Sequence, residues 1–85
     1  MSVTIYSSSL CGFCFRAKML LDQKGVDYQE FSVDNNWELR QEMMEKSGRR
    51  TVPQIWIGDQ HIGGCDELYA LDRSGELDSL LTNIQ

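Results

Sequence analysis

Residues 3–24 read VTIYSSSLCGFCFRAKMLLDQK, and this stretch decides the fold. Val3–Tyr6 alternates along the chain and is rich in β-prone side chains, which predicts a strand. From Gly12 to Lys24, apolar side chains recur every three or four residues, which is typical of one face of an amphipathic helix. Two cysteines, Cys11 and Cys14, lie where the strand passes into the helix. The segment therefore predicts a strand–helix unit with a pair of thiols at the start of the helix.

The rest of the chain continues the alternation of strands and helices. The predicted elements are a strand at Val26–Val33, a helix at Trp37–Ser47 capped by Asn35-Asn36, strands at Gln54–Ile57 and His61–Ile62 around a turn at Gly58–Gln60, and helical pieces at Asp66–Leu71 and Leu77–Ile84. The order is β-α-β-α-β-β-α(α), and its first unit requires a right-handed crossover between parallel strands. We expect a single domain over residues 1–85, of the α/β class, with a mixed four-stranded sheet flanked by helices. A C-x-x-C between the first strand and helix makes this a thioredoxin-like fold.

The composition excludes two large classes of function. The chain carries a net charge of −5, whereas proteins that bind nucleic acid present a basic patch or stripe. It has no run of about 18 apolar residues, so we expect neither a membrane span nor a membrane partner. Its first residues lack the basic start and the apolar stretch of a secretory signal. We therefore expect a cytoplasmic protein.

The C-x-x-C pair predicts redox chemistry with two different roles. Cys11 lies at the helix N-terminus, where free N–H groups and the helix dipole favour the thiolate, which is the form that attacks a disulfide. Cys14 lies on the apolar stripe and should be more buried. We expect Cys11 to be the attacking thiol and Cys14 the resolving thiol. The alternative is that both are incidental helix cysteines.

A zinc site is a second alternative, because Cys11, Cys14, His61 and Cys65 together supply a Cys₃His set. The spacing His61-x-x-x-Cys65 is not a usual second half of such a site. We therefore expect no metal site, and an ordinary strand role for His61.

Two further motifs follow the cysteine pair. Thr51-Val52-Pro53 could simply start a strand, but its place before the third strand predicts a cis-proline loop that presents the Val52 backbone to a substrate. Gly63-Gly64-Cys65-Asp66 could end a strand and cap a helix, or its N–H groups could hold a carboxylate while Asp66 pairs with an ammonium group. The γ-glutamyl end of glutathione carries both of those groups.

With these motifs in order, the sequence resembles the short, bacterial-type dithiol glutaredoxins over essentially its whole length. The matching pieces are Cys11-x-x-Cys14 with Arg16-Ala17-Lys18, Ser47-Gly48-Arg49, Thr51-Val52-Pro53-Gln54-Ile55 and Ile62-Gly63-Gly64-Cys65-Asp66. The resemblance implies a glutathione-dependent oxidoreductase that reduces protein–glutathione mixed disulfides and protein disulfides. It implies Cys11 and Cys14 as catalytic residues, and glutathione contacts from Phe13, Arg40, Thr51, Val52, Pro53, Gly64, Cys65 and Asp66. Arg40 would lie near the glycyl carboxylate, and Cys65 would act through its backbone.

The sequence departs from the family pattern at two places. The usual C-P-Y-C is Cys11-Gly12-Phe13-Cys14, which keeps an aromatic wall but loses the proline, and the usual lysine three residues before the nucleophile is Ser8. Arg16, Arg40 or Arg49 could compensate for that lysine.

Relatives with glycine in place of the proline include cluster binders, so the alternative is a dimer that holds a 2Fe–2S cluster through Cys11 and glutathione. Otherwise we expect a monomer that needs no metal and whose partners are glutathione and glutathionylated or disulfide-bonded proteins.

Overall fold

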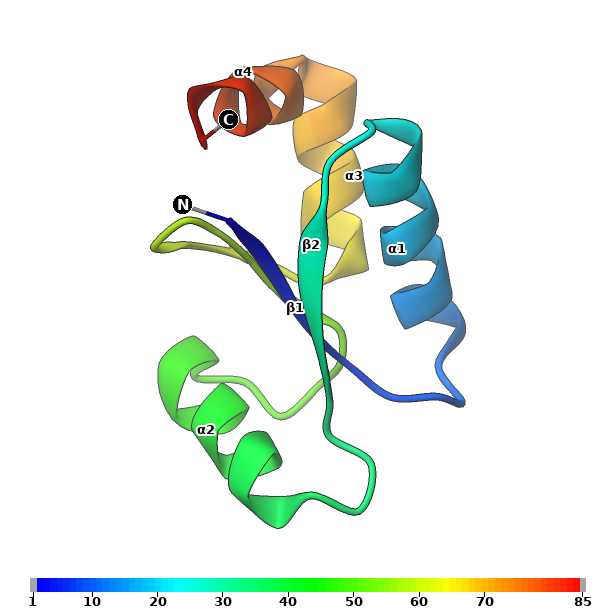
Figure 1. Ribbon diagram of the computed structural model, residues 1–85, viewed down its shortest axis with the longest axis vertical. Helices are drawn as coiled ribbons and strands as arrows, with labels where there is room; N and C mark the ends of the chain where they lie inside the picture. Colours follow the sequence, from blue (N-terminus) through cyan, green and yellow to red (C-terminus); the bar gives the residue numbers. More distant parts are fainter. Residues whose placement is uncertain (1, 85) are drawn as a thin grey trace.

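The computed structural model describes residues 2–84, and a four-stranded sheet lies at its centre (Figure 1). The elements are β1 (Val3–Ser7), α1 (Gly12–Gln23), β2 (Tyr28–Ser32), α2 (Trp37–Ser47), β3 (Gln54–Ile57), β4 (Gln60–Gly63), α3 (Cys65–Ser74) and α4 (Glu76–Ile84). The strand order is β2-β1-β3-β4, with β1 parallel to β2 and antiparallel to β3, and β4 antiparallel to β3. The predicted order of elements and the mixed sheet are confirmed.

Several predicted bounds differ from the structure by a residue or two, and those of the second strand and of the third helix differ most. The second strand is shorter than the predicted Val26–Val33, because both terminal valines are buried in the core without being part of the strand. The Val26 amide instead bonds to the Leu21 carbonyl at 3.4 Å, in the turn that ends α1. The predicted helix Asp66–Leu71 is too short, since α3 starts one residue earlier and runs on until Gly75.

The helices divide between the two faces of the sheet (Figure 1). On one face α1 and α3 pack side by side, and α4 adds Leu77 and Leu81 to the same core. On the other face α2 contributes to a smaller cluster of Tyr6, Val33 and Met43. Met43 is the one fully buried residue of α2, as the diffuse apolar stripe of this helix predicts. None of the helices within residues 2–84 is long and apolar enough to span a membrane.

The sheet topology brings three loops to one end of the molecule. In the antiparallel pair of β1 and β3, Tyr6 near the end of β1 lies opposite Gln54 at the start of β3. In the pair of β3 and β4, Ile55 lies opposite Gly63 at the end of β4. The loop into α1, the loop into β3 and the turn into α3 therefore meet at one edge, although they are far apart in the sequence.

Candidate active site

Cys11 lies at the amino end of α1, in the position that caps the helix. Its carbonyl oxygen accepts a hydrogen bond from the Phe15 amide at 3.1 Å, and its Sγ accepts one from the Cys14 amide at 3.1 Å. The sulfur therefore lies among amide N–H groups that have no partner inside the helix, at the positive end of the helix dipole. The residue is half-buried, so a substrate sulfur can reach it.

Cys14 lies in the opposite environment, fully buried on the inner side of α1. Burial raises the pKa of the Cys14 thiol well above its ordinary value, and the hydrogen bond with Cys11 acts in the same direction. Cys14 is therefore a protonated thiol at neutral pH. The predicted difference in burial between the two thiols is present in the structure. Cys65, the third cysteine, is also buried, and all three thiols are free.

The loop before β3 brings a backbone carbonyl to the Cys11 sulfur. The Val52–Pro53 peptide bond is cis, as the motif predicts. The thiol of Cys11 donates a weak hydrogen bond to the Val52 carbonyl oxygen, with 3.7 Å between sulfur and oxygen. The Val52 backbone therefore faces the same space as the sulfur.

The turn between β4 and α3 is built around Glu67. Gly64 caps the helix, and its amide donates a hydrogen bond to Glu67 Oε1 at 2.7 Å. Arg49 Nη1 reaches the same oxygen at 2.8 Å. The Gly64 amide first, and the Arg49 guanidinium second, hold the pKa of the Glu67 carboxyl below its usual range. Because the Gly64 amide is engaged by Glu67, the amides of Cys65 and Asp66 are the ones left for a ligand in this turn.

Asp66 is not the helix cap, which corrects one of its two predicted roles. It is the second residue of α3, and its carboxylate is exposed. Within residues 2–84 the Asp66 carboxylate makes no hydrogen bond or ion pair. The carboxylate is therefore available to a cationic group of a ligand.

These segments line one cleft of about 300 Å³ next to Cys11. The cleft unites seven of the predicted glutathione-binding residues, and its lining is Phe13, Arg49, Thr51, Val52, Pro53, Gly64, Cys65, Asp66 and Glu67. Arg49 and Glu67 are not among the predicted site residues. The spacing Gly64-x-x-Glu67 is the signal that could have found Glu67, because a capping box places an acid three residues after the cap.

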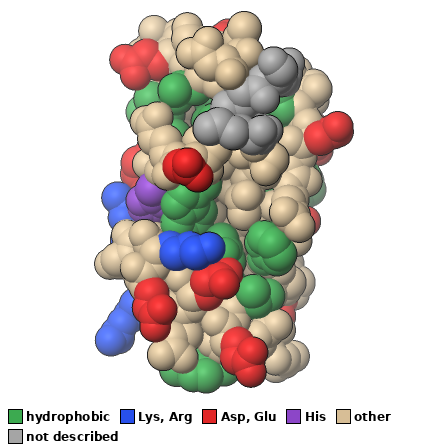
Figure 2. Space-filling model, turned by 60° about the vertical axis from the view of Figure 1, so that its left-hand side comes forward, with side chains coloured by type: hydrophobic (Ala, Val, Ile, Leu, Met, Phe, Trp, Pro, Cys, Tyr) green, Lys and Arg blue, Asp and Glu red, His purple; other side chains and the backbone are tan. Residues whose placement is uncertain are grey.

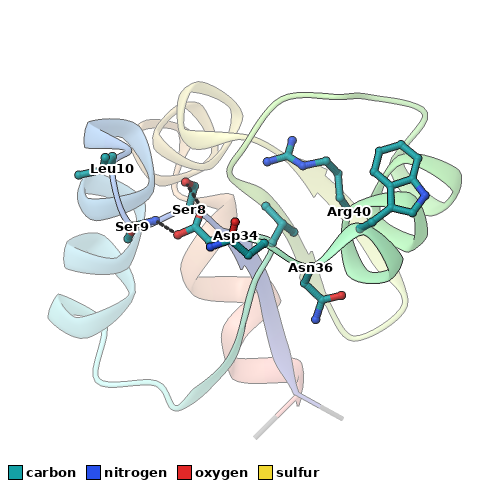
Figure 3. Close-up of a pocket in the computed structure, with 9 residues that line it drawn as sticks. Ser8, Ser9, Leu10, Asp34, Asn36 and Arg40 are labelled. Atoms are coloured by element: carbon teal, nitrogen blue, oxygen red, sulfur yellow. Dashed lines mark hydrogen bonds between the residues drawn. The ribbon is translucent and has the colours of Figure 1, made fainter.

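Arg40 lies elsewhere, in a second hollow of about 540 Å³ between α2 and the loop after β1 (Figure 3). In Figure 3, the Arg40 side chain extends from α2 across this hollow toward Ser8. The Ser8 hydroxyl donates to Asp34 Oδ1 at 2.6 Å, and the Ser9 amide donates to Asp34 Oδ2 at 2.8 Å. These bonds, that from Ser8 foremost, lower the pKa of Asp34 to about 2. Ser8 therefore holds the Asp34 carboxylate at the edge of this hollow.

The surroundings of the three candidate arginines differ. Arg16 lies over the Tyr69 ring, with 5.4 Å from its guanidinium carbon to the ring centroid, and Arg49 is paired with Glu67. Within residues 2–84, Arg40 has neither an ion pair nor a ring contact of this kind. Of the three, Arg40 is therefore the one whose guanidinium lacks such a partner among the described residues. The chain as a whole is acidic, with a net charge of −5, and Figure 2 shows acidic and basic side chains interspersed on one face.

The zinc alternative has no support in the structure. Within residues 2–84, no group of three or more His, Cys, Asp or Glu side chains is arranged to hold a metal ion. His61 instead bonds to Gln54, with 2.8 Å between His61 Nε2 and Gln54 Oε1.

Known proteins share both the sequence and the fold of this chain. The glutaredoxin family model matches residues 3–62. A glutaredoxin of Pseudomonas aeruginosa is 56% identical over 80 residues, which are 94% of this chain and 95% of that protein. Glutaredoxin 3 of Escherichia coli is 58% identical over 80 residues, covering 94% of this chain and 96% of that protein.

Solved structures agree with these matches. The crystal structure of a buckwheat glutaredoxin–glutathione complex has a TM-score of 0.90 and 36% identity, and the match covers 98% of this chain and 78% of that one. The solution structure of glutaredoxin from Brucella melitensis has a TM-score of 0.87 and 50% identity, covering 100% and 92%. The predicted thioredoxin-like fold is thus confirmed. With two thiols of opposite burial at a helix N-terminus, the chain belongs to the glutaredoxin family of thiol–disulfide oxidoreductases.

Proposed function

We propose that this protein is a glutathione-dependent oxidoreductase that reduces protein–glutathione mixed disulfides and protein disulfides. The observation that carries the proposal is the cleft beside Cys11. It places the Val52 backbone in one cleft with a turn whose Cys65 and Asp66 amides and Asp66 carboxylate have no partner among residues 2–84. The setting we propose is the cytosol, where glutathione keeps thiols reduced.

The groups of the cleft match those of glutathione from one end to the other. The amides of Cys65 and Asp66 take the γ-glutamyl carboxylate, which also lies at the positive end of the α3 dipole. The Asp66 carboxylate takes the γ-glutamyl ammonium group, and the Val52 backbone pairs with the cysteinyl unit. Phe13, whose side chain is 56% exposed, forms an apolar wall of the cleft. Support also comes from the buckwheat relative, whose structure is a complex with glutathione.

The glycyl carboxylate points toward the second hollow in this proposal. Arg40 lies there, and its guanidinium is the cation with which the carboxylate pairs. The other charged side chain that lines this hollow is Asp34, whose carboxylate repels the glycyl carboxylate. We therefore assign Arg40 a supporting role in binding that is weaker than the role of Asp66.

The reaction proceeds by two thiol–disulfide exchanges. The Cys11 thiolate attacks the glutathione sulfur of a protein–glutathione disulfide, a bond forms between the two sulfurs, and the protein sulfur leaves as a thiolate that takes a proton from solvent. A second glutathione, as thiolate, then attacks the glutathione sulfur bound to Cys11. Oxidised glutathione leaves, and the Cys11 thiolate is restored. One free glutathione thiol is consumed for each protein–glutathione disulfide reduced, because the other half of the oxidised glutathione comes from the substrate, and no other reductant enters these steps.

Cys14 serves substrates that contain a disulfide within one protein. There, Cys11 forms a mixed disulfide with the substrate, and the Cys14 sulfur attacks Cys11 Sγ while its proton passes to the departing substrate thiolate. A Cys11–Cys14 disulfide forms and the substrate leaves as a dithiol. Two glutathione thiols then reduce the Cys11–Cys14 disulfide in turn, and oxidised glutathione leaves. The Cys14 amide already lies 3.1 Å from Cys11 Sγ, so the two residues are adjacent before the reaction. The raised pKa of Cys14 keeps it from reacting with other disulfides in the meantime.

The proposal is tested with Cys11→Ser and Cys14→Ser in a glutathione-coupled assay with a glutathionylated peptide. Cys11→Ser should abolish turnover, whereas Cys14→Ser should keep most of it, because glutathione itself resolves the intermediate. Loss of turnover in Cys14→Ser equal to that in Cys11→Ser would show that the route through a second glutathione is wrong.

A dimer that holds a 2Fe–2S cluster through Cys11 and glutathione remains the alternative prediction. No contact within residues 2–84 favours it over catalysis. The visible absorbance of protein purified without oxygen is the measurement that tests it.

A further inference from the structure

Gln54 is a buried polar side chain that ties the loop facing Cys11 to the sheet behind it. Its side chain is 0% exposed. Its Nε2 donates to the Thr51 carbonyl at 3.0 Å and lies 3.2 Å from the Thr51 hydroxyl, and its Oε1 lies 2.8 Å from His61 Nε2. Both amide hydrogens and the amide oxygen of Gln54 therefore have partners, as buried polar groups require.

The direction of each bond follows from the partners. The Thr51 carbonyl can only accept, so the NH₂ end of Gln54 faces Thr51 and the oxygen faces His61. That oxygen can only accept in turn, so His61 Nε2 carries the hydrogen. Neutral imidazole with this tautomer and imidazolium both donate from Nε2, so the bond persists when His61 titrates. Burial and, after it, the Arg49 charge lower the pKa of His61, while Glu67 opposes them.

The donor is itself fixed in place by aromatic packing. The His61 ring lies 4.8 Å from the Trp56 ring, centroid to centroid, and Trp56 packs edge-on against Tyr6 at 5.4 Å. His61 therefore presents its N–H to Gln54 from a packed surface and not from a free side chain.

The far end of this chain of bonds is the loop that carries Val52. Within residues 2–84, the hydrogen bonds of Thr51 all come from Gln54, and Pro53 has no amide hydrogen to tie the loop to β1. Thr51 is exposed, so water competes for its carbonyl whenever Gln54 turns away. The orientation of the Thr51–Val52 segment therefore depends on how firmly the Gln54 amide is held.

We propose that His61 and Gln54 are positioning residues for the thiol substrate. His61 orients the Gln54 amide, Gln54 fixes the Thr51 carbonyl, and the Val52 backbone is thereby presented to the cysteinyl unit of glutathione. The inference rests on the proposed function for the identity of that substrate, but the positioning of the loop is a property of the free protein.

The test compares three variants of the full chain. His61→Phe keeps a ring against Trp56 but removes the donor, His61→Gln keeps a donor, and Gln60→Ala changes an exposed neighbour on β4 as a control. In the coupled assay His61→Phe should raise the KM for a glutathionylated peptide roughly fivefold, the size expected for one hydrogen bond, with kcat within about twofold. His61→Gln and Gln60→Ala should stay within about twofold of the wild type in both constants. Gln60→Ala should also leave the rate at which iodoacetamide alkylates Cys11 unchanged.

A KM for His61→Phe equal to that of the wild type would overturn the proposal, and so would an equal rise in His61→Gln. If His61→Phe does not fold, His61→Leu removes the same donor with different packing. A measurement on the free protein separates this inference from the proposed function. In His61→Phe, the ¹⁵N order parameters of the Thr51 and Val52 amides should fall below the rigid value of about 0.85. Absence of wild-type turnover would refute the proposed function, whereas unchanged order parameters would refute the positioning role by themselves.

Discussion

Replacement of Gly63 by alanine should damage both the stability of the protein and its glutathione cleft. Gly63 has a φ of +118°, and a Cβ at this position would lie 2.5 Å from Glu67 Oε1 and 2.9 Å from Glu67 Cγ. Backbone strain at such an angle costs about 1–3 kcal/mol for a residue with a side chain. Glu67 would also have to swing away, and it would then lose the hydrogen bond that it accepts from the Gly64 amide.

The second cost can be estimated from the chemistry of that bond. A hydrogen bond to a charged group contributes about 1.5–3 kcal/mol, and the lower end applies because the Glu67 side chain is 43% exposed. Gly63→Ala should therefore lower the free energy of unfolding by about 2.5–4.5 kcal/mol. Gly75→Ala is the matched control, since Gly75 has a φ of +84° with nothing within 4 Å of the added Cβ. It should cost only about 1–2 kcal/mol.

Urea denaturation of the two variants measures this difference directly. A third protein, with Gly63→Ala in a Glu67→Ala background, isolates the contribution of the carboxylate, because most of the overlap is then gone. The cost of Gly63→Ala should fall there to its backbone part. Equal costs for Gly63→Ala and Gly75→Ala, or a cost of Gly63→Ala that does not depend on Glu67, would refute the reasoning.

Three further predictions concern charged groups around the cleft. Asp66→Ala should raise the KM for glutathione roughly tenfold, or about 1.4 kcal/mol, because the γ-glutamyl ammonium group loses its partner. The same change should alter the free energy of unfolding by less than about 0.5 kcal/mol, because Gly64 and not Asp66 caps the helix. Arg40→Gln should raise the KM for glutathione about fivefold and leave that for γ-glutamylcysteine unchanged, because this thiol lacks the glycyl carboxylate. The Asp34 carboxylate, whose pKa is lowered to about 2, stabilises the fold above the unfolded-state pKa of about 3.9 and loses this contribution as the pH falls toward 2. Urea denaturation from pH 5 to pH 2 should therefore show a steeper loss of stability for the wild type than for Asp34→Asn.

The elements with a local signal could be predicted from the sequence, and the errors have physical causes. The period of apolar side chains located α1, and the C-x-x-C at its start located the site. The ends of β2 could not be located in this way, because Val26 and Val33 are buried by helices on opposite faces of the sheet and resemble strand residues for that reason. Burial leaves the same mark on the sequence whether or not a residue pairs with a neighbouring strand.

The residue pattern at the start of α3 does not determine which acidic side chain bonds to the backbone of the turn. Asp66 and Glu67 are adjacent acids after two glycines, and either could hold an amide of the turn. In the structure the Gly64 N–H points to the Glu67 carboxylate and not to that of Asp66. The direction of this N–H depends on how the chain leaves β4. The bond between Ser8 and Asp34 is equally hidden, because it joins residues 26 positions apart through the parallel register of β1 and β2. Contacts of this kind require the register, which composition and spacing do not contain.

The topology explains why the chemistry and the recognition lie in separate segments. Cys11 is supplied by the loop after β1, the Val52 backbone by the loop before β3, and the amide groups by the turn after β4. Because β3 is antiparallel to both neighbours, an end of β1, the start of β3 and an end of β4 must come to the same edge of the sheet. Two side chains then hold these segments in place: Gln54 ties the loop to β3, and Glu67 ties the turn to α3. Substitutions at these two ties should therefore change substrate binding more than the reactivity of Cys11, whose bond from the Cys14 amide belongs to α1.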